Sequence, residues 1–178
     1  MIFKDMVQRL RFAFSLQQFP GETGTSAMVA VRTALSQAGV KKYGAMTKEA
    51  VEELRGAAKA VIGETLALPP FERDALLAAH SRSWESKRLA TDNLRHHFMP
   101  LLAGLLDDKE LAGKLVTRHY IANRDRGSGW GKADLAEHYR IGMERLERAI
   151  ALVDRHAKEL EHAALQTLEA KIAEIEHA

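Results

Sequence analysis

The sequence predicts an all-α fold, a multi-helix domain whose carboxyl-terminal helix-turn-helix runs into a long final helix. Ala, Leu, Glu, Arg and Lys dominate the composition, whereas Val, Ile, Thr and aromatic residues are sparse, and this balance favours helices. No stretch alternates apolar and polar residues with the period of two that strands show. The four prolines, at positions 20, 69, 70 and 100, can all be read as helix boundaries.

The first 67 residues predict a unit of three helices. An apolar stripe with helical spacing runs through residues 3–17, and the breaker-rich loop FPGETGT follows it. Ser26 is expected to cap a second helix that Gly39 ends. Thr47 is expected to cap a third helix that reaches about residue 66.

The segment Leu68-Pro69-Pro70 is the sharpest break in the chain, and it predicts a division into residues 1–67 and residues 68–178. A helix should begin at Pro70, because the missing proline N–H costs nothing in the first turn of a helix.

Residues 84–106 predict a helical insertion within the second unit, in which Pro100 begins a short continuation. Asp107 or Asp108 is expected to cap a further helix that ends near Ile121. The side chains of the insertion that are expected to face inward are Leu89, Leu94 and Phe98.

The segment KADLAEHYRIGMERLERA, residues 132–149, reads as a helix-turn-helix, because its apolar residues occupy the positions that the shared core of two short helices needs. The residue at the turn position that glycine usually holds is Arg140, so a left-handed backbone there would carry a Cβ penalty. The core positions are Leu135, Tyr139, Ile141, Leu146 and Ala149.

The exposed face of residues 143–151 is expected to be presented to a partner, most often the major groove of DNA. This face carries both signs of charge, since Glu144 and Glu147 share it with Arg145 and Arg148. Carboxylates can accept hydrogen bonds from cytosine N4, so mixed charge is compatible with base reading.

From Met143 almost to the end, apolar residues recur every three or four positions, which predicts a helix of about 35 residues and roughly 50 Å. So long an apolar seam needs a cover. Either the amino-terminal helices return to it, or a second chain packs on it, and we expect a homo-oligomer formed through this helix. The seam positions are Leu146, Ile150, Val153, Ala157, Leu160, Ala164, Leu168, Ile172 and Ile175.

The net charge of +2 gives no global attraction to nucleic acid. Residues 1–106 hold 14 Lys and Arg against 10 Asp and Glu, whereas residues 107–178 hold 12 against 14. Any DNA affinity of the second unit must therefore come from a local cluster. Its members are Arg118, Arg124, Arg126, Lys132, Arg140, Arg145 and Arg148.

Catalytic, metal and cofactor chemistry is not expected. The chain has no cysteine, which excludes disulfides and thiol catalysis. The loop GSGWGK fails as a phosphate loop, because Arg126 replaces its first glycine and Ala133 its hydroxyl residue. Adjacent His96 and His97 point about 100° apart on a helix, so they cannot easily share an ion. No apolar run is long enough to span a bilayer and no signal peptide is recognised, which favours a cytoplasmic location.

Two segments resemble the sigma-factor region that reads the −35 element. LPPFERDALLAAHS, residues 68–81, resembles its opening helix, and LAEHYRIGMERLERAIALV, residues 135–153, resembles its helix-turn-helix. With about fifty residues between them, the layout resembles phage late-gene antitermination proteins of the Q type over roughly residues 68–165. The residues that carry the resemblance are Leu68, Pro69, Glu72, Arg73, Leu76, Leu77, Trp84, Leu115, Val116, Tyr120, Leu135, Ala136, Tyr139 and Ile141.

The resemblance implies a regulator that binds duplex DNA near a late promoter in a bacterial host cell and makes RNA polymerase read through terminators. Arg140, Met143, Glu144, Glu147 and Arg148 would then face the bases, while Arg124, Arg126 and Lys132 would contact phosphates. Several such proteins carry a cysteine-rich zinc insertion, which this chain lacks. Its insertion would have to hold itself by packing of Trp84, Leu89, Leu94, Phe98, Leu101 and Leu105.

A second hypothesis comes from a different class of protein. The chain would be a non-enzymatic helical interaction or assembly protein that works through its long carboxyl-terminal helix. The excess of acidic residues in 107–178 favours this hypothesis.

Overall fold

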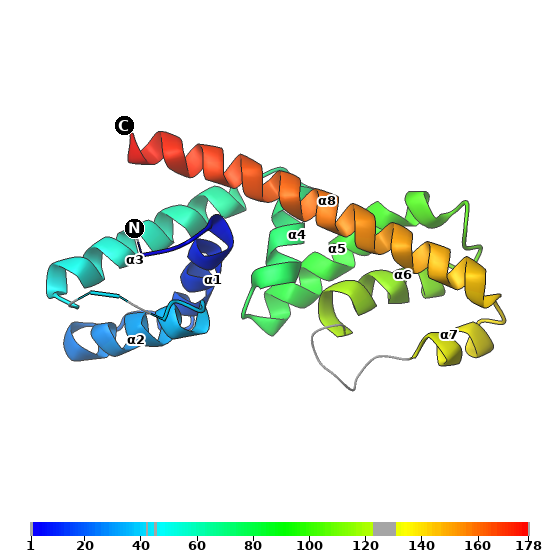
Figure 1. Ribbon diagram of the computed structural model, residues 1–178, viewed down its shortest axis with the longest axis horizontal. Helices are drawn as coiled ribbons and strands as arrows, with labels where there is room; N and C mark the ends of the chain where they lie inside the picture. The colour runs from blue at the N-terminus through cyan, green and yellow to red at the C-terminus, as the bar shows by residue number, and fades with distance from the viewer. Residues whose placement is uncertain (1, 42, 45, 123–130, 178) are drawn as a thin grey trace.

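The computed structural model describes residues 2–41, 43–44, 46–122 and 131–177, which form helices and no strand (Figure 1). The all-α fold class predicted from the sequence is confirmed. In chain order the elements are α1 (Met6–Leu16), α2 (Gly24–Gln37), α3 (Lys48–Leu66), α4 (Pro70–His80), α5 (Trp84–Leu102), α6 (Lys109–Thr117), the π-helical turn η1 (Arg118–Ala122), α7 (Lys132–His138) and α8 (Met143–Glu176).

Side-chain caps fix the start of several helices. The predicted cap at Thr47 is confirmed, since its Oγ1 accepts a hydrogen bond from the Ala50 N–H at 3.2 Å. Of the two aspartates predicted to cap α6, Asp108 does so. The cap predicted at Ser26 is wrong, because α2 already begins at Gly24, whose φ of +57° glycine adopts without penalty.

Helix α5 runs through Pro100 without a break, so the predicted boundary at this proline is wrong. Proline removes one backbone hydrogen bond from a helix interior. Here the loss falls in the last turn, and Phe98 and Leu102, both 1% exposed, hold the helix on either side of it. The packing of these two side chains therefore outweighs the tendency of proline to end a helix.

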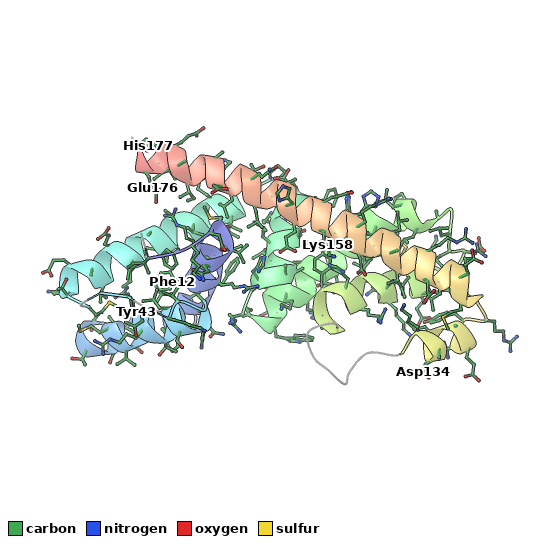
Figure 2. All side chains as sticks on the ribbon, in the orientation of Figure 1. Phe12, Tyr43, Asp134, Lys158, Glu176 and His177 are labelled. Atoms are coloured by element: carbon green, nitrogen blue, oxygen red, sulfur yellow. The ribbon has the colours of Figure 1, made fainter. Side chains whose placement is uncertain are left out.

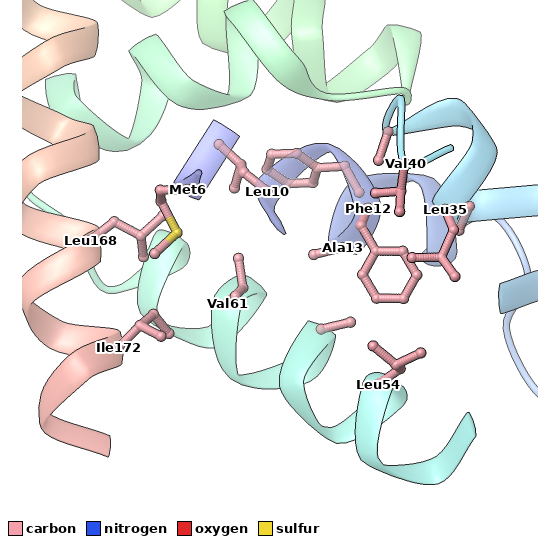
Figure 3. Packing of buried hydrophobic residues seen from close by; sticks show 14 of the residues in the cluster. Met6, Leu10, Phe12, Ala13, Leu35, Val40, Leu54, Val61, Leu168 and Ile172 are labelled. Atoms are coloured by element: carbon pink, nitrogen blue, oxygen red, sulfur yellow. The ribbon is translucent and has the colours of Figure 1, made fainter. Parts of the chain in front are cut away.

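The buried apolar residues form two clusters. The first joins α1, α2 and α3 to the carboxyl-terminal part of α8, and Figure 3 shows Leu168 and Ile172 of α8 beside Met6 and Val61. The second cluster joins α4, α5, α6 and α7 to the amino-terminal half of α8. The division into residues 1–67 and 68–178 stays a prediction. Helix α8, which belongs to the second of these units, completes the core of the first.

Helix α8 has 34 residues, which at about 1.5 Å per residue is roughly 50 Å, and it crosses both clusters (Figure 1). Of the two predicted covers for its seam, the structure uses the chain's own helices. The need for a cover therefore no longer favours the predicted homo-oligomer. Ile175 is 48% exposed, and its predicted place in the seam is wrong. The buried seam residues are Leu146, Val153, Ala157, Ala164, Leu168 and Ile172, whereas Ile150 and Leu160 are partly buried.

The insertion packs through fewer side chains than the sequence predicts. Leu94 and Phe98 are buried as expected, but Leu89 is 59% exposed, because five residues along a helix turn it about 140° away from Leu94. Trp84 and Leu101 are 60% and 41% exposed, since they lie at the two ends of α5, where less of the chain covers the helix.

Candidate nucleic-acid interface

The predicted helix-turn-helix is present as α7, a four-residue connection and the start of α8. Its core side chains lie in the second cluster: Leu135 is 2% exposed, and Leu146 and Ala149 are fully buried. Tyr139 and Ile141 of the connection are partly buried against the same cluster. The pair is therefore packed on the body of the protein, and Asp134 of α7 lies at the opposite end of the molecule from Glu176 of α8 (Figure 2).

The connection is a Schellman turn. The N–H of Ile141 donates to the Ala136 carbonyl at 3.0 Å, and the N–H of Arg140 donates to the Glu137 carbonyl at 3.2 Å. Arg140 has a φ of 50°, so the left-handed conformation predicted at this position is confirmed. The turn exposes the Arg140 side chain next to the first residue of α8.

Helix α7 is fixed at its start by two polar contacts. The Asp134 carboxylate accepts from the N–H of Gly131 at 3.1 Å. The Lys132 ammonium donates to the Glu147 carboxylate of α8 at 3.0 Å, and both side chains are about half exposed. Lys132, predicted as a phosphate contact, therefore also holds α7 against α8.

The first two turns of α8 present their outer face to solvent. Arg148 is 62% exposed and its guanidinium lies 3.4 Å from the Glu144 carboxylate, itself 86% exposed. Met143 at the start of the helix is 42% exposed. We name the exposed residues Arg140, Met143, Glu144 and Arg148 together the outer face; of these, Glu144 and Arg148 lie one turn apart on α8 and contact each other.

Arg145 lies on a flank of α8 instead. Its guanidinium donates to the Leu105 carbonyl and to the Asp107 carboxylate, the second at 3.1 Å. This residue ties α8 to the connection between α5 and α6. Glu147 lies on the other flank, where it holds Lys132. Arg124 and Arg126, predicted as phosphate contacts, lie outside the described residues.

A polar clamp that sequence reasoning missed fixes the end of α7 on α6. The Tyr139 hydroxyl donates to the Glu110 carboxylate at 2.9 Å, and the Lys114 ammonium lies 5.2 Å from the centre of the Tyr139 ring. Hydrogen bonds from Lys114 and then from Tyr139 lower the pKa of the exposed Glu110 carboxyl. The sequence signal for this contact was the pair Glu110 and Lys114, which lie four residues apart on one helix and can therefore form an ion pair.

The turn η1 ties the segment before α7 to α8. His119 Nδ1 lies 2.6 Å from an Asp154 carboxylate oxygen. Tyr120 is 2% exposed and its hydroxyl has no hydrogen-bond partner among the described residues. Burial, and after it the Glu161 carboxylate, raises the pKa of Tyr120. Tyr120 therefore serves as an apolar anchor in the second cluster.

The electrostatic balance of the interface is close to neutral. Lys132, Arg145 and Arg148 each have a carboxylate within salt-bridge distance. Arg140 has none among the residues that the structure describes. Sequence reasoning also missed Arg155, which is 65% exposed and stands seven residues beyond Arg148 on the same side of α8.

The remaining site predictions concern metals and membranes. Over the described part of the chain, no group of three or more His, Cys, Asp or Glu side chains is placed to hold a metal ion. No helix in the same part of the chain combines the length and the apolar character needed to cross a membrane.

No family model matches the chain, and no curated protein matches it. The resemblance to sigma factors and Q-type antiterminators therefore rests on the residues quoted from the sequence alone.

Proposed function

We propose that the chain is a non-enzymatic DNA-binding protein that places the outer face of α8 in the major groove. The observation that supports this is the packed helix pair, in which Arg140 of the Schellman turn and Met143, Glu144 and Arg148 at the start of α8 are all exposed. A helix of this kind enters the groove with its first turns against the base edges.

The residue chemistry suggests reading of G·C pairs. An arginine such as Arg148 can donate two hydrogen bonds to guanine, and a carboxylate such as Glu144 can accept from cytosine N4. Lys132 and Arg140 flank the outer face and would contact phosphates, which fix the position of the protein without reading sequence. Arg124 and Arg126 stay predicted phosphate contacts on sequence grounds.

The near-neutral balance leads us to expect weak binding to random DNA. Phosphate attraction supplies most of the sequence-independent affinity, and here carboxylates offset three of the cations. A useful affinity would then depend on base contacts or on a second bound protein.

The experiment is a binding titration with labelled duplexes, both random and G·C-rich, at about 50 mM and about 200 mM salt. Arg148→Glu should weaken binding at least about tenfold, because it removes one base contact and adds repulsion from phosphates. The matched control is Arg88→Glu on α5, where Arg88 is 60% exposed and also pairs with a carboxylate four residues away.

Absence of binding to every duplex at the lower salt concentration would count against the proposal. An equal loss in the Arg88→Glu control would also contradict it, because the effect would then follow net charge and not the outer face.

The more specific proposal is a phage late-gene antiterminator that engages host RNA polymerase in the bacterial cytoplasm. It rests on the sequence resemblance, and it predicts read-through of a terminator in a purified transcription reaction. Arg148→Glu should abolish this read-through on a template that carries the binding site. A protein that binds DNA without changing read-through would reduce the proposal to a DNA-binding regulator.

The competing proposal is a helical interaction or assembly protein that works through α8. The carboxylate partners of Lys132, Arg145 and Arg148 favour it, because they leave little net positive charge for DNA. The apolar seam of α8 is already used inside the chain, so such a protein would have to use the polar side of this helix. Light scattering of the purified chain, with and without duplex DNA, separates the two proposals.

A further inference from the structure

A groove of about 640 Å³ lies between the end of α1, the connection that follows it and α3, far from the outer face of α8. Such a groove offers a binding surface that the proposed DNA contact does not use. The apolar residues that line it are Ala13, Leu16, Phe19, Pro20, Ala58 and Ile62.

The polar rim of the groove carries two cations, of which Arg55 is partly offset by Glu52. Lys59 and Arg55 line it, and the described lining residues include no Asp or Glu. The Arg55 guanidinium donates to the Glu22 carbonyl at 2.6 Å and lies 3.8 Å from the Glu52 carboxylate, so it is held in place. Lys59 is exposed, and no carboxylate among the described residues is within salt-bridge distance of it.

The groove is open at Gly63. This residue lies inside α3 and lines the groove, and a Cβ added to it would meet no atom within 4 Å. A glycine within a helix lowers stability relative to alanine, and here no close packing inside the protein requires it. Leu66, one turn further along the same side of α3, is 56% exposed and extends the apolar strip.

We propose that this groove binds an acidic amphipathic helix of a partner protein. The apolar face of that helix would lie on Leu16 and Ile62 and pass close to Gly63, and its carboxylates would lie beside Lys59 and Arg55. A helix fits an open groove through anchors that recur every three or four residues. Complementary charge selects an acidic sequence over a basic one.

The occupant is a protein and not DNA for a physical reason. A phosphate backbone would use the two cations but would gain nothing from the apolar floor, which a helical partner would bury.

The test is a selection from displayed peptides of about 16 residues, roughly four helical turns. Leucines are fixed at helical spacing, and the other positions are drawn equally from Asp, Glu, Lys, Arg and Ser. The full-length chain is the target, and Gly63→Leu, which fills the groove, is the counter-target. Enriched peptides should be acidic, and their affinity should fall about tenfold or more with Gly63→Leu or Lys59→Glu, as measured by fluorescence anisotropy.

Gly56→Leu is the matched control. Gly56 is also a glycine within α3 whose added Cβ meets nothing within 4 Å, but it does not line this groove. This variant should bind the peptides as the unchanged chain does, and thermal melts should show all three variants folded.

Four outcomes would overturn the proposal: no enrichment, enrichment of basic or uncharged peptides, equal binding by the folded Gly63→Leu variant, or displacement of the peptide by duplex DNA. The last would assign Lys59 and Arg55 to a nucleic-acid surface. None of the first three depends on whether the outer face of α8 binds DNA.

Discussion

At the scale of single residues, Arg140 adopts a backbone conformation that lowers stability locally but that the turn of the helix-turn-helix requires. A left-handed backbone costs a residue with a Cβ about 1–2 kcal/mol. The Schellman turn requires this conformation, and Arg140 adopts it with a φ of 50°. The exposed cation at this position suits contact with a phosphate, which glycine could not make.

Arg140→Gly should therefore raise the free energy of unfolding, by about 0.5–1 kcal/mol, because the relief of strain exceeds the extra entropy of glycine in the unfolded chain. Urea denaturation measures the change. Arg88→Gly within α5 is the control and should lower the same quantity by about 1 kcal/mol. If both variants lose stability equally, Arg140 carries no strain.

Glu144 is the residue most opposed to DNA on the outer face. Glu144→Gln should raise the affinity for random duplex about three- to tenfold near 50 mM salt, because it removes one charge repelled by phosphates and releases Arg148 from its partner. Stability should fall by about 0.3–1 kcal/mol, since an acidic residue in the first turn of a helix interacts favourably with the helix dipole. Anisotropy titrations and thermal melts measure the two effects, and a weaker affinity at low salt would contradict the expected sign.

At the scale of elements, two arginines three residues apart on α8 have different roles. Arg145 bonds to the connection between α5 and α6, whereas Arg148 faces solvent beside Glu144. Arg145→Ala should lower the free energy of unfolding by about 1–2 kcal/mol, because it leaves the Leu105 carbonyl without this donor. Arg148→Ala should change it by less than about 0.5 kcal/mol.

Duplex binding should show the opposite order, with the larger loss for Arg148→Ala. Chemical denaturation and anisotropy on the same two proteins make the comparison. Equal effects of both variants on both measurements would mean that the two arginines share one role.

The elements that sequence predicts well are those that local spacing determines. The two helices around Arg140, the cap at Thr47 and the seam of α8 all follow from residues within one or two turns of each other. The roles of Arg145 and Leu89 were not predictable in this way. The first depends on a partner 40 residues away, and the second depends on which side of α5 its neighbours cover.

At the scale of the whole molecule, α8 is the element that unites the two clusters. Leu168 is fully buried among side chains of α1 and α3, although it belongs to the helix that begins at the Schellman turn of the helix-turn-helix. The sequence predicted that this seam needs a cover, but it could not tell which helices supply it, because that depends on contacts over more than a hundred residues.

Leu168→Ala should therefore lower the free energy of unfolding by about 2–5 kcal/mol, the usual cost of a buried leucine truncated to alanine. Hydrogen exchange should accelerate in α1 and α3 as well as at the end of α8. The exposed neighbour Glu169→Ala is the control and should stay within about 0.5 kcal/mol. Faster exchange confined to α8 would mean that the amino-terminal helices do not depend on it.

Helix α8 is shared by both ends of the molecule, and it therefore also fixes how far apart they lie. It extends about 50 Å from the second cluster to the first, and this length sets the separation between the two ends. Neither end can swing independently without bending this helix or stripping its side chains from one of the two cores. A ligand bound at one end would therefore keep a fixed position relative to a ligand bound at the other end.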